Sequence, residues 1–201
     1  AEAGIVGFSV GMAMAGFRPV IELQFDAFAY PAFEQIASHV ARMRNRTSGR
    51  VNLPIVIRIP FGGGIGGVEH HCDSSEAYYA HTAGLKVVTP ATVADAYTLL
   101  REAINDPDPV VFMEPKRLYW SKGSIETACA AKIFDSFGRA AVRREGTDVT
   151  LVAYGPSLDG AMEAASAAQG EGWSVAVCDL RTSFPCDEER RRAPGRGRRA
   201  P

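Results

Sequence analysis

The chain begins with AEAGIVGFSVGMAMAGFRPVIELQFDAFAYPAF, residues 1–33, and this stretch predicts a helix followed by a strand. Residues 3–16 are almost all glycine, alanine, serine or medium-sized apolar residues, so a helix here can be buried on every face. Glu2 comes just before them, where the helix dipole favours a negative charge and low dielectric strengthens a hydrogen bond. From its spacing alone, Glu2 is either a functional carboxylate or an N-terminal capping acid.

The rest of the first 120 residues alternates between strand and helix patterns. A β-branched or apolar run predicts each strand, and apolar residues at helical spacing predict each helix. Thr92 is a predicted N-cap, with Asp95 three residues further on. The expected strands lie at residues 18–24, 53–60, 85–90 and 109–115, and the expected helices at 31–46, 74–81 and 92–105. This alternation predicts an α/β fold in which a parallel sheet has helices on both faces.

A second, incomplete α/β domain is expected near the C-terminus, because a strand, a helix and another strand follow residue 147. The mixed, less apolar stretch before it is interpreted as an interdomain connection. The last residues change abruptly to arginine, glycine, alanine and proline, which indicates a disordered basic tail or, as we favour, a reading-frame artefact. The expected divisions are residues 1–120, 121–146, 147–188 and 189–201.

Composition narrows the class of protein. The 201 residues are 46% hydrophobic, which is enough for a large core. A formal net charge of -1 argues against a protein that binds nucleic acid or is held electrostatically at a membrane. No apolar run reaches the roughly 18 residues that span a bilayer. The four cysteines have no C-x-x-C spacing, so a soluble cytoplasmic protein is expected.

Three glycines in the loop after the second expected strand fit G-x-G-x-x-G: Gly62, Gly64 and Gly67. Pro60 and Phe61 interrupt the required strand-to-helix turn, and the next strand, LKVVTP, ends without an acid for a ribose hydroxyl. These departures argue against a dinucleotide-binding domain, for which the glycines are the only support. The loop is expected to let backbone approach a ligand closely, or to be a flexible surface loop.

The HHC cluster, residues 70–72, together with His81, raises the question of a metal site. We expect adjacent histidines in an extended segment to point to opposite sides, and no second ligand pair has zinc spacing. Both points argue against a metal.

Polar and aromatic residues also follow two expected strands. Gln24 and Phe28 lie at and just after a strand end, where open parallel sheets bind ligands, and Tyr30 is a weaker candidate. Phe28 is equally consistent with a core aromatic. Asp106 and Asp108, in NDPDPV, most simply form a turn.

Several blocks of the sequence together resemble the beta subunits of thiamine-diphosphate-dependent 2-oxo acid dehydrogenases, above all the branched-chain (2-oxoisovalerate) type. The resemblance extends from Glu2 to about Thr182 and implies a transketolase-like pyrimidine-binding domain. The blocks are Glu2 with GIVG (4–7), ELQFDAFAYPAFEQI (22–36), RIPFGGGIGG (58–67), HHCDSSEAYYAH (70–81), GLKVVTPATVADAY (84–97) and DPDPVVFMEPKRLYW (106–120).

The resemblance implies oxidative decarboxylation of a 2-oxo acid and transfer of the acyl group to a lipoyl domain. Glu2 is then the acid that hydrogen-bonds a nitrogen of the aminopyrimidine ring, and Gln24 and Phe28 line the pocket for that ring. His71 is the active-site histidine, which orients the substrate carboxylate or passes a proton during acyl transfer.

The resemblance also implies partners and ions. No diphosphate and magnesium motif, such as GDG followed by paired asparagines, is present. An alpha subunit is therefore expected to hold the magnesium and the diphosphate, beside a second beta subunit and the lipoyl domain of a dihydrolipoyl acyltransferase. The family places a potassium ion near the NDPDPV turn. Its ligands would come from Leu53, Ile55, Ala103, Asp106 and Asp108.

Alternatives stay open at this point. Within the same class, the chain fits a pyruvate or acetoin dehydrogenase beta subunit. In another class, it fits a non-catalytic assembly or regulatory module of the same fold, which a solvent-exposed Glu2 would favour. The preferred 2-oxo acid does not follow from the sequence.

Overall fold

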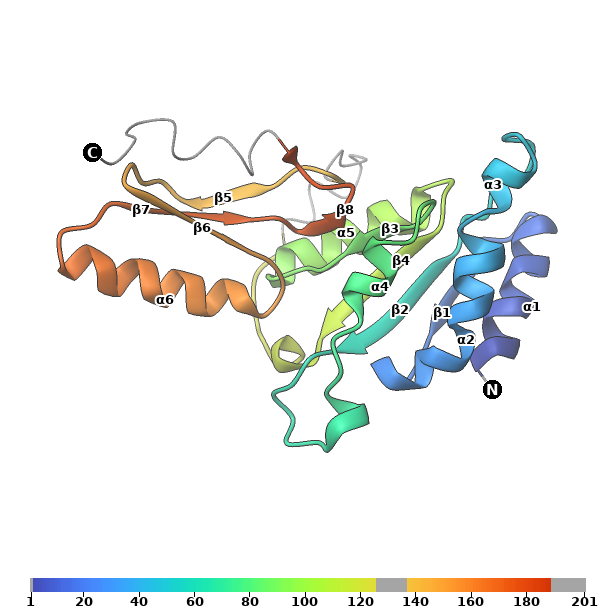
Figure 1. Ribbon diagram of the computed structural model, residues 1–201, viewed down its shortest axis with the longest axis horizontal. Coiled ribbons are helices and arrows are strands. Elements are labelled where there is room, and N and C mark those ends of the chain that lie inside the picture. Colours follow the sequence, from blue (N-terminus) through green and yellow to red (C-terminus); the bar gives the residue numbers. More distant parts are fainter. Residues whose placement is uncertain (1, 126–136, 189–201) are drawn as a thin grey trace.

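Two sheets organise the part of the chain that the computed structural model describes, residues 2–125 and 137–188 (Figure 1). The larger sheet has the strand order β1-β2-β4-β3-β8, and the smaller has the order β5-β7-β6. The strands are β1 (Val20–Glu22), β2 (Val56–Phe61), β3 (Lys86–Val88), β4 (Val110–Pro115), β5 (Ala141–Arg144), β6 (Val149–Ala153), β7 (Val175–Asp179) and β8 (Thr182–Phe184).

Helical segments connect these strands. None of the described helices is long and apolar enough to cross a membrane. The α-helices are α1 (Glu2–Met14), α2 (Tyr30–Glu34), α3 (Met43–Arg46), α4 (Glu76–Ala80), α5 (Val93–Asn105) and α6 (Ser157–Gly170). Short 3-10 segments are η1 (Asp26–Ala29), η3 (Glu69–His71) and η4 (Lys116–Leu118), and η2 (Gln35–Val40) is a π-helix.

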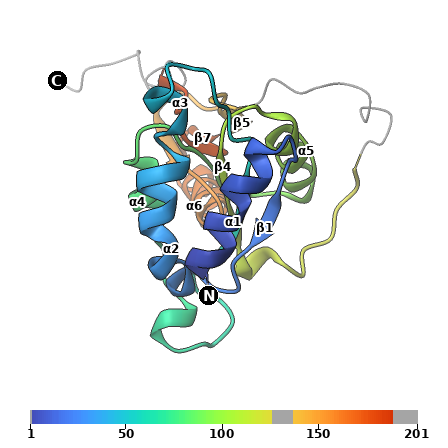
Figure 2. The same cartoon turned by 90° about the vertical axis from the view of Figure 1, so that its right-hand side faces the viewer.

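Strands β1, β2, β4 and β3 are parallel to their neighbours, as predicted. Side chains on opposite faces of this sheet enter different cores. Ile57 and Met113 pack with α1, α2 and α4, whereas Val56 and Phe112 pack with α5. Figure 2 shows α1 and α2 lying toward the viewer, with α5 on the other side of the sheet. The predicted arrangement of a parallel sheet with helices on both faces is therefore confirmed.

Helix α1 differs from the sequence-based expectation of burial on every face. Val6, Ser9 and Ala13 are buried against the sheet and the neighbouring helix. Ile5 is 41% exposed and Phe8 is 72% exposed. The small side chains permit burial all round, but in this chain only one side of the helix has a neighbour to cover it.

The predicted helix at residues 31–46 is confirmed in outline but is made of three pieces: α2, η2 and α3. Ile36 and Val40, two of its expected apolar residues, are fully or almost fully buried. Gly84 packs against the end of η2, where an added Cβ would lie 1.9 Å from the Ala41 carbonyl oxygen. With a φ of +102°, this position requires glycine and fixes the turn before β3 against the helix.

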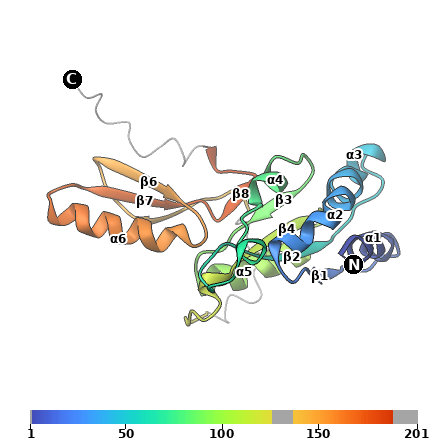
Figure 3. The ribbon, with the colours of Figure 1, turned by 60° about the horizontal axis from the view of Figure 1, so that its bottom comes forward.

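The second unit contains β6, α6 and β7 where the sequence predicted them, with α6 along one face of the small sheet (Figure 3). The expected connection at residues 121–146 needs correction, because β5 lies inside it and pairs with β7. This short strand, AVRR, has two apolar residues followed by two arginines and no alternation, so the sequence did not reveal it. The expected tail at residues 189–201 lies outside the described residues.

Strand β8 was not anticipated. It follows the second sheet in sequence but pairs antiparallel with β3 of the first. A charged cluster reinforces the junction: Arg143 donates to Asp95 on α5 and, at 2.8 Å, to Asp179 on β7. The two units are therefore joined by a shared sheet and by ion pairs.

Candidate functional site

Several predicted site residues lie at the C-terminal edge of the large sheet, the end toward which β1, β2 and β4 run. Gln24 and η1 follow β1, the loop with η3 follows β2, and η4 follows β4. Helix α1 begins at the same end with Glu2, as Figure 1 shows. The segment η1 contacts both α1 and η3. The fold therefore brings the start of α1 together with the segments that carry Phe28 and His71.

Four rings form an aromatic cluster at this edge. Phe25 meets His71 edge to face, with the ring centroids 4.6 Å apart. Phe28 lies 5.8 Å from Phe25 and 5.9 Å from both His70 and His71. Such edge-to-face contacts stabilise aromatic pairs and fix the ring planes. Phe28 and His71 each contact the other three rings, and the sequence analysis singled out both, whereas it did not single out Phe25.

The two histidines do not point to opposite sides, so that expectation was wrong. Their rings lie 4.2 Å apart, because residues 69–71 form a 3-10 helix and not an extended segment. His70 also lies 3.2 Å from Glu69, which lowers the pKa of that exposed carboxyl. Among the described residues, no group of three or more His, Cys, Asp or Glu side chains is placed to hold a metal ion.

Asp26 anchors the loop that carries the histidines. It is fully buried and accepts hydrogen bonds from the backbone N–H of Ser75, at 2.8 Å, and from the Ser75 hydroxyl. Burial raises the pKa of Asp26, and the Ser75 hydrogen bonds oppose that rise. On the other side of the loop, the Gly62 N–H donates to the Asp73 carbonyl oxygen at 2.7 Å. The acid inside QFDAF was the only sequence signal for this anchor.

Lys116 is a buried cation beside the same cluster and was also missed. Lys116 comes directly after β4 in the sequence and is 3% exposed. Its Nζ lies 5.8 Å from the centroid of the Phe25 ring and has no hydrogen-bond partner in the described part of the chain. Burial lowers the pKa of Lys116, while Cys72 and Asp26 oppose that change. Nothing in the sequence distinguished this lysine from a solvated one.

The four predicted site residues differ in exposure. Glu2 and Phe28 are partly buried, Gln24 is exposed, and His71 is partly buried. A carboxylate, an amide and an aromatic ring suit a flat heterocycle with ring nitrogens, because they supply hydrogen bonds at its edge and a stacking face. These residue types fit the aminopyrimidine half of thiamine diphosphate. The individual assignments remain predictions.

The expected potassium site lies at the opposite, N-terminal edge of the sheet. Its carboxylates are already in ion pairs: Asp106 with Lys86 at 2.5 Å, and Asp108 with Arg44 at 2.5 Å. The Asp108 N–H also donates to Asp106 Oδ1 at 2.8 Å. These contacts account for the turn without a bound ion.

The carbonyl groups expected at that site also have donors. The Ile55 N–H donates to the Leu53 carbonyl oxygen at 2.8 Å, and the Val110 N–H donates to that of Ile55 at 2.9 Å. The Ala103 carbonyl oxygen accepts from the Asp106 N–H at 3.3 Å. Carbonyl oxygens have a second lone pair, so potassium binding stays a prediction.

Two family profiles match the chain. "Transketolase, pyrimidine binding domain" matches residues 1–121, and "Transketolase, C-terminal domain" matches residues 138–194. Their junction falls between the two sheets of the structure.

Curated relatives include beta subunits of two kinds. The chain is 52% identical over 188 residues to the 3-methyl-2-oxobutanoate dehydrogenase subunit beta of Mycobacterium tuberculosis, which covers 93% of the chain and 53% of that relative. It is 49% identical to the pyruvate dehydrogenase E1 component subunit beta of Leifsonia xyli, over 93% of the chain and 55% of the relative. The 2-oxoisovalerate dehydrogenase subunit beta of Bacillus subtilis is 43% identical, over 94% of the chain and 57% of that relative. The chain thus spans about half the length of these relatives.

A solved structure described as "Split gene transketolase, inactive beta4 tetramer" has the same fold. It superposes with a TM-score of 0.74 at 26% identity, covering 94% of this chain and 57% of that one.

Proposed function

Because the chain belongs to the transketolase pyrimidine-binding domain family, we propose that it is part of the beta subunit of a branched-chain 2-oxo acid dehydrogenase. In this proposal it supplies the aminopyrimidine half of a thiamine diphosphate site. The enzyme would oxidatively decarboxylate a branched 2-oxo acid and pass the acyl group to a lipoyl domain.

The observation that carries the proposal is the meeting of α1, η1 and η3 at the C-terminal edge of the parallel sheet. Open parallel sheets bind their ligands at this edge. Of the segments that meet there, α1 begins with Glu2, η1 includes Phe28 and η3 ends with His71. Identity of 52% to a 3-methyl-2-oxobutanoate dehydrogenase subunit beta supports the substrate class.

Each side chain has a defined task in this proposal. Glu2 holds a proton between its carboxyl and a ring nitrogen of the pyrimidine, and Phe28 offers a face on which that ring stacks. When bound, thiamine diphosphate supplies the carbanion chemistry that releases carbon dioxide from a 2-oxo acid. His71 orients the substrate carboxylate or moves a proton during acyl transfer, and its edge-to-face contact with Phe25 fixes its ring plane.

Partners complete the proposed site. We assign the magnesium ion and the diphosphate to an alpha subunit, because no acidic cluster of the described residues could hold a metal. The exposed apolar side of α1, with Phe8 at 72% exposure, suits burial against another subunit. A second beta subunit and the lipoyl domain of an acyltransferase complete the assembly. Potassium has no step in this mechanism.

A cytoplasmic location is part of the proposal. The described cysteines, Cys72, Cys178 and Cys186, are free thiols. Free thiols fit a reducing compartment.

Reconstitution tests the function directly. The chain is produced with an alpha subunit, and reductive acylation of a lipoyl domain is measured with 3-methyl-2-oxobutanoate, pyruvate and acetoin. We expect the fastest acylation with 3-methyl-2-oxobutanoate. Preference for pyruvate would instead support the pyruvate dehydrogenase alternative, which the 49% identical relative keeps open. No acylation with any of the three would support a non-catalytic assembly module.

A further inference from the structure

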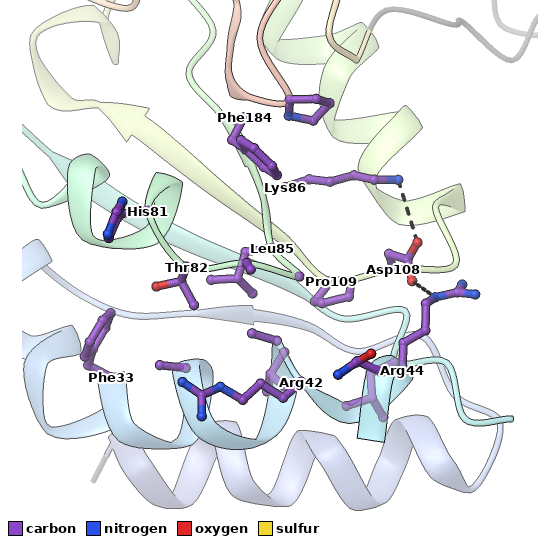
Figure 4. A pocket seen from close by; sticks show the side chains of 18 residues that line it. Phe33, Arg42, Arg44, His81, Thr82, Leu85, Lys86, Asp108, Pro109 and Phe184 are labelled. Atoms are coloured by element: carbon purple, nitrogen blue, oxygen red, sulfur yellow. Dashed lines mark hydrogen bonds and ion pairs between the residues drawn. The ribbon is translucent and has the colours of Figure 1, made fainter. Parts of the chain in front are cut away.

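A large pocket lies at the N-terminal edge of the parallel sheet, away from the aromatic cluster (Figure 4). Its volume is about 980 Å³, within the usual range of ligand pockets. Leu53, Lys86 and Pro109 line it, and these residues precede or begin β2, β3 and β4. Six residues of β4 separate this edge from Lys116, a separation of roughly 20 Å at about 3.3 Å per residue. The pocket is therefore distinct from the candidate catalytic edge.

The pocket has an apolar middle. Leu53, Leu85 and Val40 are almost completely buried and contribute to its walls, with Phe33 at one end and Phe184 on β8 above them. These three side chains have almost no surface left in contact with water. The apolar surface that a hydrocarbon group could cover is on Phe184, which is 44% exposed, and on the partly buried Phe33. The space between Phe33 and Phe184 therefore favours an aliphatic or branched apolar group.

Most charges around the pocket are already neutralised. Arg44 and Lys86 stand at one end with Asp108, which lies 2.5 Å from Arg44 and 4.0 Å from Lys86. Lys86 is also 2.5 Å from Asp106. These two cations therefore have carboxylate partners within the chain.

Arg42 is the exception. It stands with His81 and Thr82 toward the end of the pocket that Phe33 occupies (Figure 4). Within residues 2–125 and 137–188, neither the Arg42 guanidinium nor the His81 ring has a hydrogen bond or ion pair. One unpaired guanidinium can bind one carboxylate through two parallel hydrogen bonds.

We propose that this pocket is a binding site for an aliphatic monocarboxylate. Its carboxylate pairs with Arg42 next to Thr82 and His81, and its apolar chain extends from Phe33 toward Phe184. A single unpaired cation at the rim favours one negative charge over the several charges of a nucleotide. Two sources have this chemistry: a fatty acid and a branched 2-oxo acid. This site goes beyond the proposed function and does not depend on it.

Calorimetry on the chain alone tests the site, because neither the cofactor nor an alpha subunit is needed. The probes are octanoate, 4-methyl-2-oxopentanoate and the uncharged 1-octanol. We expect octanoate to bind in the millimolar range or tighter, and 1-octanol to bind at least tenfold more weakly. Binding of 4-methyl-2-oxopentanoate as tight as that of octanoate would identify a 2-oxo acid as the source, and weaker binding would identify a fatty acid.

Variants locate the binding. Arg42→Gln should weaken octanoate binding by about tenfold or more, as expected for losing a charge-assisted hydrogen bond. Ala83→Phe, an exposed lining position, should fill the pocket and also reduce binding. The control is Arg50→Gln, an exposed arginine outside the pocket, which should bind like the unaltered chain.

Three results would overturn the proposal. The first is the absence of octanoate binding, and the second is equal binding of octanoate and 1-octanol. The third is unchanged octanoate binding in the Arg42→Gln variant whose melting temperature matches that of the unaltered chain. None of these results bears on acyl transfer at the other edge, so the two proposals fail separately.

Discussion

Two buried charged residues at the C-terminal edge of the parallel sheet differ from the paired carboxylates at its N-terminal edge. At the N-terminal edge, Asp106 and Asp108 each have a cationic partner within 2.5 Å. At the C-terminal edge, and within the described part of the chain, the buried Asp26 has only Ser75 as hydrogen-bond donor and the buried Lys116 Nζ has no hydrogen-bond partner. Paired charges stabilise a turn, whereas buried charges without a close opposite charge lower stability. Such costs are typical of functional sites, so the comparison itself points to the C-terminal edge.

The largest expected effect comes from Glu2 at the C-terminal edge. In the complex with an alpha subunit, Glu2→Gln should leave folding intact and lower turnover by about a hundredfold or more, because a positioned acid-base group is lost. Steady-state turnover and circular dichroism measure the two effects. Glu163→Gln on α6 is a matched control that should keep full turnover. Near-normal turnover of the Glu2 variant would remove Glu2 from the site.

His71 and His70 separate three explanations of the HHC cluster. If His71 acts on the bound acyl group, His71→Ala should reduce lipoyl acylation about tenfold or more, and more than it weakens cofactor binding. His70→Ala should reduce it less, although the two rings lie only 4.2 Å apart. Acylation rates and calorimetry measure these effects.

The other two explanations give different results. A zinc site would make both variants and Cys72→Ser lose metal in elemental analysis. A purely structural cluster would lower the melting temperature of both histidine variants while the activity per folded molecule stays the same. Unchanged acylation by His71→Ala would remove His71 from the catalytic residues.

Substituting one lysine at each edge tests the difference between the edges through the free energy of unfolding alone. Lys86→Met should lower the free energy of unfolding by about 1 kcal/mol, because it leaves Asp106 without its partly exposed partner. Lys116→Met should leave that free energy unchanged or raise it by up to about 1 kcal/mol, because it removes a buried ammonium that has no hydrogen-bond partner among the described residues. Urea unfolding measures both. Equal losses of stability in the two variants would contradict the distinction between the edges.

The smallest effect concerns pH. Burial raises the pKa of Asp26 above the usual 3.8, so the folded chain holds this proton to higher pH than the unfolded chain does. The Asp26 contribution to stability is therefore fully present below about pH 4 and is lost as the pH rises through the raised pKa. Urea unfolding across this range should show a smaller decrease for Asp26→Asn than for the unaltered chain. Parallel pH profiles would refute this role of Asp26.

The fold was predictable because its periodic signals are strong. The β-branched runs at 53–60 and 109–115 became β2 and β4, and the Thr92 hydroxyl accepts from the Asp95 N–H as a cap should. Strand β8 was not predictable, because three residues, TSF, carry no periodicity and pair across the two units.

The candidate site was predictable in part. The resemblance directed attention to Phe28 and His71, which the structure brings into one cluster. Phe25, Asp26 and Lys116 were missed, because a sequence shows the type of a side chain but not whether it is buried or paired. The wrong expectation for the two histidines came from assuming extended backbone where a 3-10 turn forms.

The central claim is that this chain supplies only the pyrimidine half of a shared cofactor site. Calorimetric titration with thiamine diphosphate and magnesium tests it most directly, on the chain alone and on the chain assembled with an alpha subunit. We expect weak binding to the chain alone, and tight, magnesium-dependent binding only to the assembly. Tight, magnesium-dependent binding to the chain alone would contradict the claim, because the diphosphate site would then lie within this chain.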